Sequence, residues 1–176
     1  MILKLKRTPG IYLVGFMGSG KSVVGSRLAG QLAWTFCDID SDIESERGAT
    51  ISSIFEVSGE EEFRRLETEA IWKRVRLIQA GTPMVVALGG GAFLRDENYE
   101  LLQSNGVTVW LDCPLPLIRR RLEGSTNRPL ARDPNKFELL YWSRREGYAR
   151  ADYRIEISGD DPSTAVNDIL ELPLFQ

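Results

Sequence analysis

The fold is decided by one stretch of the chain, Gly15-Phe16-Met17-Gly18-Ser19-Gly20-Lys21-Ser22, which fits the phosphate-binding P-loop pattern G-x-x-x-x-G-K-[ST]. An apolar run over 11–14 predicts a strand before it, and apolar residues at every fourth position predict a helix over 21–32. In this setting the glycines let backbone N–H groups surround a polyphosphate, and the helix N-terminus adds partial positive charge. The stretch therefore predicts a nucleotide site, with Lys21 beside the β- and γ-phosphates and Ser22 as a ligand of Mg²⁺.

Short apolar runs alternate with helical patterns along the rest of the chain, which is typical of a parallel sheet covered by helices. Strands are predicted over 11–14, 35–37, 84–88, 107–111 and 154–157. Helices are predicted over 21–32, 98–103, 117–122, 137–149 and 163–170, and two more begin at capping boxes over 41–44 and 58–61 and end near 48 and 78. The polar stretch 124–136 has no apolar period, and we interpret it as a mobile lid rather than a disordered surface loop.

Length and composition indicate one soluble α/β domain over residues 1–176. Apolar residues make up 43% and charged residues 27%, which is enough to bury a core. The net charge of −3 argues against a nucleic-acid partner or a polybasic membrane surface, and no stretch has the length of a transmembrane helix. No signal peptide is evident, and Cys37 and Cys113 form no CxxC motif, so we expect reduced core thiols and a cytoplasmic protein.

The chain contains no histidine, and this excludes several kinds of active site. Ser-His-Asp and Cys-His nucleophiles, histidine-ligated zinc and histidine acid–base catalysis all need the residue that is missing. An enzyme with this sequence must carry out its chemistry with carboxylates, lysine, arginine and backbone amides, together with any metal ion that it binds.

Two further groups follow predicted strands, at the sheet edge where open α/β sheets bind ligands. Asp38 and Asp40 follow the second predicted strand, and alternation along an extended segment would put both carboxylates on one side. One carboxylate could serve Mg²⁺ through water and the other meet a substrate hydroxyl; the alternative is helix capping. Gly89-Gly90-Gly91 ends the third predicted strand, either as a permissive turn or as a place where a ligand approaches the backbone closely.

Charge is unevenly distributed along the sequence. Acidic residues are concentrated between Asp38 and Glu69, and basic residues between Arg119 and Arg150. This pattern indicates either two solvated faces of opposite charge or a metal-binding side that faces a phosphate-binding side across a cleft.

Together these motifs resemble the shikimate kinase family over almost the whole chain. The matching elements are the P-loop over 15–22, Asp38-Ile39-Asp40, residues 59–64, the glycines over 89–91 and Asn127-Arg128-Pro129-Leu130. The resemblance implies a three-layer P-loop kinase fold with a five-stranded parallel sheet in the order 2-3-1-4-5 and a mobile lid. It also implies transfer of the ATP γ-phosphate to the 3-hydroxyl of shikimate, with Mg²⁺, in chorismate and aromatic amino-acid biosynthesis.

The resemblance assigns roles to individual positions. It implies ATP-binding roles for Gly18, Ser19, Gly20, Lys21, Ser22, Val23, Arg121 and Arg128, and metal-binding roles for Ser22 and Asp38. It implies substrate-binding roles for Asp40, Arg64, Gly89, Gly90, Gly91 and Arg144, and catalytic roles for Lys21, Asp40, Arg64 and Arg128. Arg65, the neighbour of Arg64, is interpreted as solvated.

One segment departs from the family pattern, which commonly has an arginine followed by x-Pro-Leu-Tyr. Residues 144–148 lack that Pro-Leu, and counting back from Tyr148 selects Arg144 as the second arginine for the substrate carboxylate, with Arg145 as the alternative. ATP and shikimate are the expected small-molecule partners of a monomer. The alternative functions are a gluconate-type small-molecule kinase and a non-catalytic nucleotide-binding module that regulates a partner.

Overall fold

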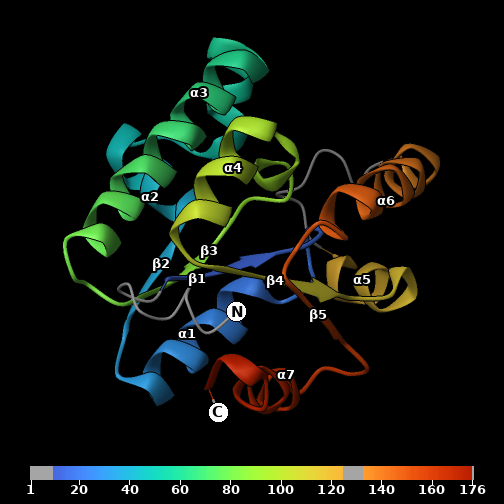
Figure 1. Ribbon diagram of the computed structural model, residues 1–176. Helices are drawn as coiled ribbons and strands as arrows, with labels where there is room; N and C mark the ends of the chain where they lie inside the picture. The colour runs from blue at the N-terminus through green and yellow to red at the C-terminus, as the bar shows by residue number, and fades with distance from the viewer. Residues whose placement is uncertain (1–9, 125–132, 176) are drawn as a thin grey trace.

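The computed structural model describes residues 10–124 and 133–175, and its central layer is a parallel sheet (Figure 1). In the described residues the strands are β1 (Gly10–Val14), β2 (Thr35–Asp38), β3 (Met84–Ala87), β4 (Val107–Asp112) and β5 (Tyr153–Glu156). They lie in the order β2-β3-β1-β4-β5, and all neighbouring pairs are parallel. In the central strand, Ile11 pairs with Val85 on one side and Val107 on the other. The predicted fold class and strand order are confirmed.

Helices cover both faces of this sheet. They are α1 (Lys21–Leu32), α2 (Ile39–Arg47), α3 (Ile51–Gln79), α4 (Asp96–Asn105), α5 (Leu115–Leu122), α6 (Pro134–Tyr148) and α7 (Pro162–Leu170), with 3₁₀ helices η2 (Ala92–Leu94) and η4 (Pro173–Phe175). α1 and α7 pack together on one face, and α3 and α4 pack together on the other (Figure 1). α5 and α6 are joined by an ion pair of 2.7 Å between Arg119 and Glu138.

The core lies between the sheet and these helices. Every residue of β1, β3 and β4 is buried, as expected for strands with helices on both faces. Cys37 and Cys113 are buried free thiols, which confirms their expected place in the core. No helix among residues 10–124 and 133–175 is both long enough and apolar enough to cross a membrane.

Two helix starts differ from the prediction. α2 begins at Ile39, because the Asp38 side chain caps it by accepting a hydrogen bond of 3.2 Å from the backbone N–H of Ser41, so the start predicted at the 41–44 capping box is wrong. α3 contains an unpredicted first segment over 51–58, capped by Thr50. At Gly59, where φ is 82°, the backbone leaves helical geometry. The predicted helix start at 58–61 coincides with this kink.

The predicted lid is shorter at its C-terminal end. α6 begins at Pro134, whose fixed φ suits the first turn, and the Asp133 carboxylate accepts hydrogen bonds from the N–H groups of Asn135 and Lys136. Placing 134–136 in the lid was therefore wrong. Residues 125–132, with Arg128, lie outside the described residues, so the lid itself stays a prediction. The other elements match their predicted ranges to within a few residues at each end.

Candidate functional site

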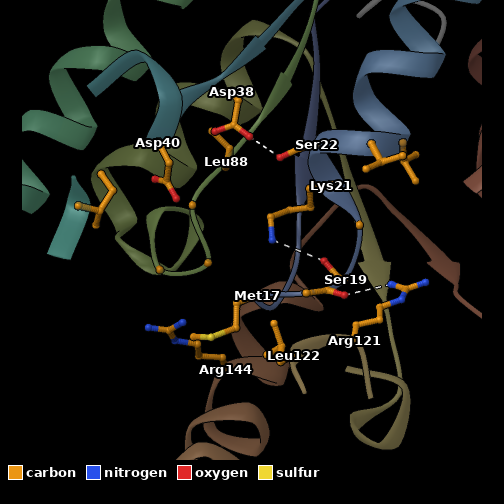
Figure 2. A pocket seen from close by; sticks show the side chains of 18 of the residues that line it. Met17, Ser19, Lys21, Ser22, Asp38, Asp40, Leu88, Arg121, Leu122 and Arg144 are labelled. Atoms are coloured by element: carbon orange, nitrogen blue, oxygen red, sulfur yellow. Dashed lines mark hydrogen bonds between the residues drawn. The ribbon is translucent and has the colours of Figure 1, made fainter. Parts of the chain in front are cut away.

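A cavity of about 980 Å³ opens at the carboxyl ends of the strands. It brings together every predicted site residue that the structure describes: Gly18, Ser19, Gly20, Lys21, Ser22, Val23, Asp38, Asp40, Arg64, Gly89, Gly90, Gly91, Arg121 and Arg144. Figure 2 shows Asp38 and Asp40 on one side of this cavity, Arg121 and Arg144 on the other, and Lys21 between them. Acidic and basic residues therefore face each other across this cavity, and the metal-binding and phosphate-binding roles of the two sides stay predictions.

The loop over 15–22 connects β1 to α1 and is shaped by its glycines. Gly15 has a φ of 144°, and a side chain there would lie 2.7 Å from the carbonyl oxygen of Leu111, so only glycine fits. Gly20 caps α1 without a side-chain hydrogen bond. The first N–H groups of α1 consequently point into the loop, where they suit an anion. Lys21 Nζ donates to the carbonyl oxygens of Gly15 at 2.7 Å and Phe16 at 2.9 Å, which holds its charge at the loop.

Ser22 and Asp38 form the pair predicted to hold a metal ion. Ser22 Oγ donates a hydrogen bond to Asp38 Oδ2 (Figure 2), and Asp38 is fixed in turn as the cap of α2. A hydroxyl and a carboxylate are hard oxygen ligands of the kind that Mg²⁺ takes, together with water and phosphate oxygens. The described residues contain no group of three or more acidic, cysteine or histidine side chains that could hold a metal without such help. The pair fits Mg²⁺ bound jointly with a polyphosphate.

Asp40 lies in the first turn of α2, so the expectation that it continues an extended segment after Asp38 is wrong. The turn of the helix nevertheless places both carboxylates in the cavity. Asp40 Oδ1 is buried without a hydrogen-bond partner in the described residues, and burial, followed by the nearby Asp38 charge, raises the pKa of Asp40. Because Asp40 lines the cavity, its carboxylate can accept a proton or a hydrogen bond from a substrate hydroxyl there.

Arg64 is held against the glycine turn over 89–91 by Glu67, a residue that the sequence did not predict in the site. Arg64 Nη1 donates to Glu67 Oε2 at 2.7 Å, and the Glu67 side chain is 0% exposed. A side chain at Gly91 would lie 2.5 Å from Arg64 Nη2, so this guanidinium needs the glycine. The spacing of three residues, which puts Arg64 and Glu67 on the same helix face, was the available signal. Arg65 instead pairs with the exposed Glu62 and Glu69, as expected for a solvated arginine.

Arg144 and Arg145 point to different surroundings. Arg144 lines the cavity beside the glycine turn, with Nη1 3.1 Å from the position of a side chain at Gly90. Arg145 donates twice to the buried Asp112, with Nη2 2.9 Å from Oδ2, and stacks on the Trp110 ring at 4.9 Å. Of the two alternatives, Arg144 is the one that can reach a ligand in the cavity.

Arg121 closes the opposite end of the cavity. Its Nη1 donates to the Gly18 carbonyl oxygen at 3.0 Å (Figure 2), and its Nη2 donates to the Gly159 carbonyl oxygen at 2.8 Å. Asp160 also pairs with Arg121 at 3.0 Å. This places the segment 159–162, between β5 and α7, beside the P-loop. No local sequence pattern distinguishes that segment from an ordinary loop, so the sequence did not predict it as part of the site.

Comparison with known proteins gives consistent results. The model of the shikimate kinase family matches residues 17–172. The chain is 43% identical to a shikimate kinase of Persephonella marina over 91% of this chain and 96% of that protein. It is 42% identical to one of Synechococcus elongatus over 92% of this chain and 85% of that protein. A solved structure of shikimate kinase from Acinetobacter baumannii in complex with shikimate has a TM-score of 0.85 and 38% identity, covering 93% of this chain and 91% of that chain.

Proposed function

The chain belongs to the shikimate kinase family and is an ATP-dependent shikimate kinase, and we propose that its cavity binds the ATP polyphosphate along the P-loop and shikimate beside Asp40, Arg64 and Arg144. The observation that carries this assignment of the cavity is the meeting of Arg64 and Arg144 at one glycine turn. They come from α3 and α6, on different sides of that turn. The product would feed chorismate and aromatic amino-acid biosynthesis.

Shikimate is a carboxylate on a ring that carries hydroxyl groups, and the cavity offers a partner for each. Two planar guanidinium groups can donate paired hydrogen bonds to a carboxylate and cannot be deprotonated. With the carboxylate held by Arg64 and Arg144, and the ring close to the backbone of Gly89-Gly90-Gly91, a hydroxyl would face Asp40. This orientation favours shikimate over the open-chain acid of a gluconate-type kinase, and a substrate site beside an intact P-loop disfavours a non-catalytic module.

Transfer of the phosphoryl group then depends on position and charge. Lys21 and the backbone N–H groups of the loop neutralise and fix the phosphates, while Asp40 orients the attacking hydroxyl and accepts its proton as the new P–O bond forms. The raised pKa of Asp40 makes its carboxylate a better proton acceptor than an exposed one. ADP leaves as the P–O bond to the γ-phosphorus breaks.

Mg²⁺ is the proposed cofactor, held by Ser22 and Asp38 together with phosphate oxygens. When bound, it supplies positive charge to the β- and γ-phosphates. Ser22 and Asp38 are already joined by a hydrogen bond, so little rearrangement is needed to present both oxygens to one ion. At the nucleotide end, Arg121 and the segment 159–162 would bracket the adenine, and Val23 would contact the nucleotide from the first turn of α1.

We propose further that the enzyme acts in the cytoplasm as a monomer. The free thiols of Cys37 and Cys113 fit a reducing compartment. All of the residues assigned here to ATP and shikimate come from one chain, so the proposed chemistry needs no second copy. Arg128 remains the proposed lid arginine that reaches the ATP phosphates.

A coupled assay of ADP release tests the assignment of the cavity. Shikimate should stimulate ADP release in the presence of Mg²⁺, whereas its methyl ester, which lacks the negative charge, and gluconate should not. Equal turnover of shikimate and the ester would contradict the binding of the carboxylate by Arg64 and Arg144, which we call the clamp. The carboxylate would then contribute nothing to substrate binding.

A further inference from the structure

Gly147 lies in the last turn of α6, where the backbone conformation would accept any residue other than proline. It is absent from the described glycines with positive φ, and a glycine in a helix costs stability relative to alanine. The reason for a glycine lies outside the helix. A Cβ atom at this position would lie 2.2 Å from Cδ2 of Leu94, so the Leu94 side chain already fills the space that a side chain at 147 would need.

Leu94 belongs to the element that follows the glycine turn of the cavity. It is the last residue of η2, and the Leu94 N–H donates to the carbonyl oxygen of Gly91 at 3.3 Å. The contact between Gly147 and Leu94 therefore sets how closely α6 approaches the turn over 89–91. Tyr148, the next residue along α6, donates a hydrogen bond from its hydroxyl to the Gly90 carbonyl oxygen and reinforces the same approach.

Arg144 lies three residues before Gly147, so both face the same side of α6. Its Nη1 is 3.1 Å from the position that a Cβ atom at Gly90 would take. A small change in the spacing between α6 and the turn would therefore displace the Arg144 guanidinium relative to the turn. On its other side α6 is held by the Arg145–Asp112 ion pair. That pair does not touch the turn over 89–91, whereas the Gly147–Leu94 contact and the Tyr148 hydrogen bond both join α6 to the turn and the residues that follow it.

We propose that Gly147 is a positioning residue for substrate binding: by letting Leu94 pack directly against α6, it holds Arg144 at the distance from the glycine turn that suits the substrate carboxylate. The proposal rests on the function assigned above to Arg144. It also gives a role to the place where this chain departs from the x-Pro-Leu-Tyr pattern, since Gly147 occupies the position of that leucine.

The test uses size changes on both sides of the contact. Gly147→Leu should raise the KM for shikimate about tenfold or more, because small displacements of a substrate-holding group have large effects. Gly147→Ala should raise it less, since only the flexible end of Leu94 must move. Neither variant should change the KM for ATP. Gly147→Leu combined with Leu94→Ala should restore the KM for shikimate if the overlap with Leu94 is the cause. The unchanged KM for ATP is the result that separates a positioning role from a general loss of stability.

Gly30→Ala is the matched control, because Gly30 is also a helical glycine but nothing lies within 4 Å of its added Cβ. It should leave both KM values unchanged. If Gly147→Leu does not fold, Gly147→Ala and the double variant still decide the matter. Unchanged KM values for shikimate, or equal increases in the KM values for shikimate and ATP, would overturn the proposal.

Arg144→Ala separates this inference from the proposed function. If that variant weakens shikimate binding and the Gly147 variants do not, only the positioning role fails. If Arg144→Ala has no effect on shikimate binding, the clamp itself is wrong and the positioning role is overturned with it.

Discussion

Asp40 and Glu67 converge on Gly89 from two different helices, with Asp40 Oδ1 2.8 Å and Glu67 Oε1 2.7 Å from the position that a side chain at Gly89 would take. Both oxygens are buried without a hydrogen-bond partner in the described part of the chain. Two carboxylates buried beside the same residue repel each other when both are ionised. Gly89 therefore leaves room for an acidic pair beside the proposed phosphoryl-transfer site, and the ionised pair destabilises the folded protein.

This destabilisation by the ionised pair should make the stability of the fold depend on pH. Burial, and then the Asp40 charge, raise the pKa of Glu67 from its ordinary 4.5, although Arg64 and Arg144 act in the opposite direction. A raised pKa means that ionised Glu67 destabilises the fold progressively as the pH rises above 4.5. Glu67→Gln removes that charge, so its melting temperature relative to the wild type should be higher at pH 7 than near pH 4.

The exposed Glu62 on the same helix provides a control of opposite sign. Its hydrogen bond to Arg65 lowers the pKa of Glu62, so its ionised form stabilises the fold above its ordinary pKa. Glu62→Gln should lose stability relative to the wild type at neutral pH and not at low pH. If the melting temperatures of both variants, relative to the wild type, changed with pH in the same direction, ionised Glu67 would not destabilise the fold.

Lys21→Ala should lower kcat by about 10²-fold or more, because phosphoryl transfer depends on neutralising the charge of the transferring group. Its Nζ is already fixed at the loop by two backbone carbonyl oxygens. Lys73→Ala is the control, since Lys73 only pairs with Glu46 at the surface. Steady-state assays of ADP release give both values. Near-normal turnover by Lys21→Ala would contradict the nucleotide site.

Asp40→Asn keeps the shape of the side chain and removes the proton acceptor. We expect ATP affinity, measured by calorimetric titration, to survive while kcat falls by about 10²-fold or more. Asp42→Asn, on the same helix but paired with Arg74 outside the cavity, should leave turnover intact. A loss of ATP affinity with an unchanged kcat would move Asp40 to the metal site.

The sequence predicted local features better than contacts between distant segments. The P-loop is local, because Gly15, Lys21 and Ser22 belong to one strand–loop–helix unit, and its position needs no other part of the chain. The strand order came from family resemblance, since hydrophobic patterns do not specify which strands are neighbours. Glu67 was missed because a glutamate on a helix is normally exposed, whereas here it is buried and paired with Arg64.

Asp38 caps α2 and also pairs with Ser22, so the cap does not preclude the metal-binding role, which stays a prediction. Capping and metal binding were treated as alternatives for this carboxylate, and the structure shows Oδ1 accepting from the N–H of Ser41 while Oδ2 accepts from Ser22. Asp38 rather than Ser41 caps α2 because β2 ends at Asp38 and leaves its backbone extended, as an N-cap residue requires. Sequence patterns alone cannot rank two overlapping caps, because the ranking depends on where the sheet ends.

The substrate clamp gives the sharpest prediction, because the chain contains a matched control for each arginine. Arg64→Lys and Arg144→Lys keep the charge but lose the planar fork, so each should weaken shikimate binding about tenfold or more, which corresponds to about 1.4 kcal/mol. Arg65→Lys should not, since Arg65 pairs only with the exposed Glu62 and Glu69. Calorimetric titration with shikimate, and with ATP as a second ligand, measures each affinity.

Arg145→Lys separates the clamp from the packing of α6. Arg145 makes paired hydrogen bonds with the buried Asp112, so the lysine variant should lower the melting temperature while affecting shikimate affinity less than Arg144→Lys. Titration with methyl shikimate adds a second comparison. A variant of a residue that binds the carboxylate should lose much of the wild-type preference for shikimate over its methyl ester. If Arg145→Lys reduces shikimate affinity more than Arg144→Lys, α6 presents a different arginine to the substrate, and the register inferred from Tyr148 is off by one residue.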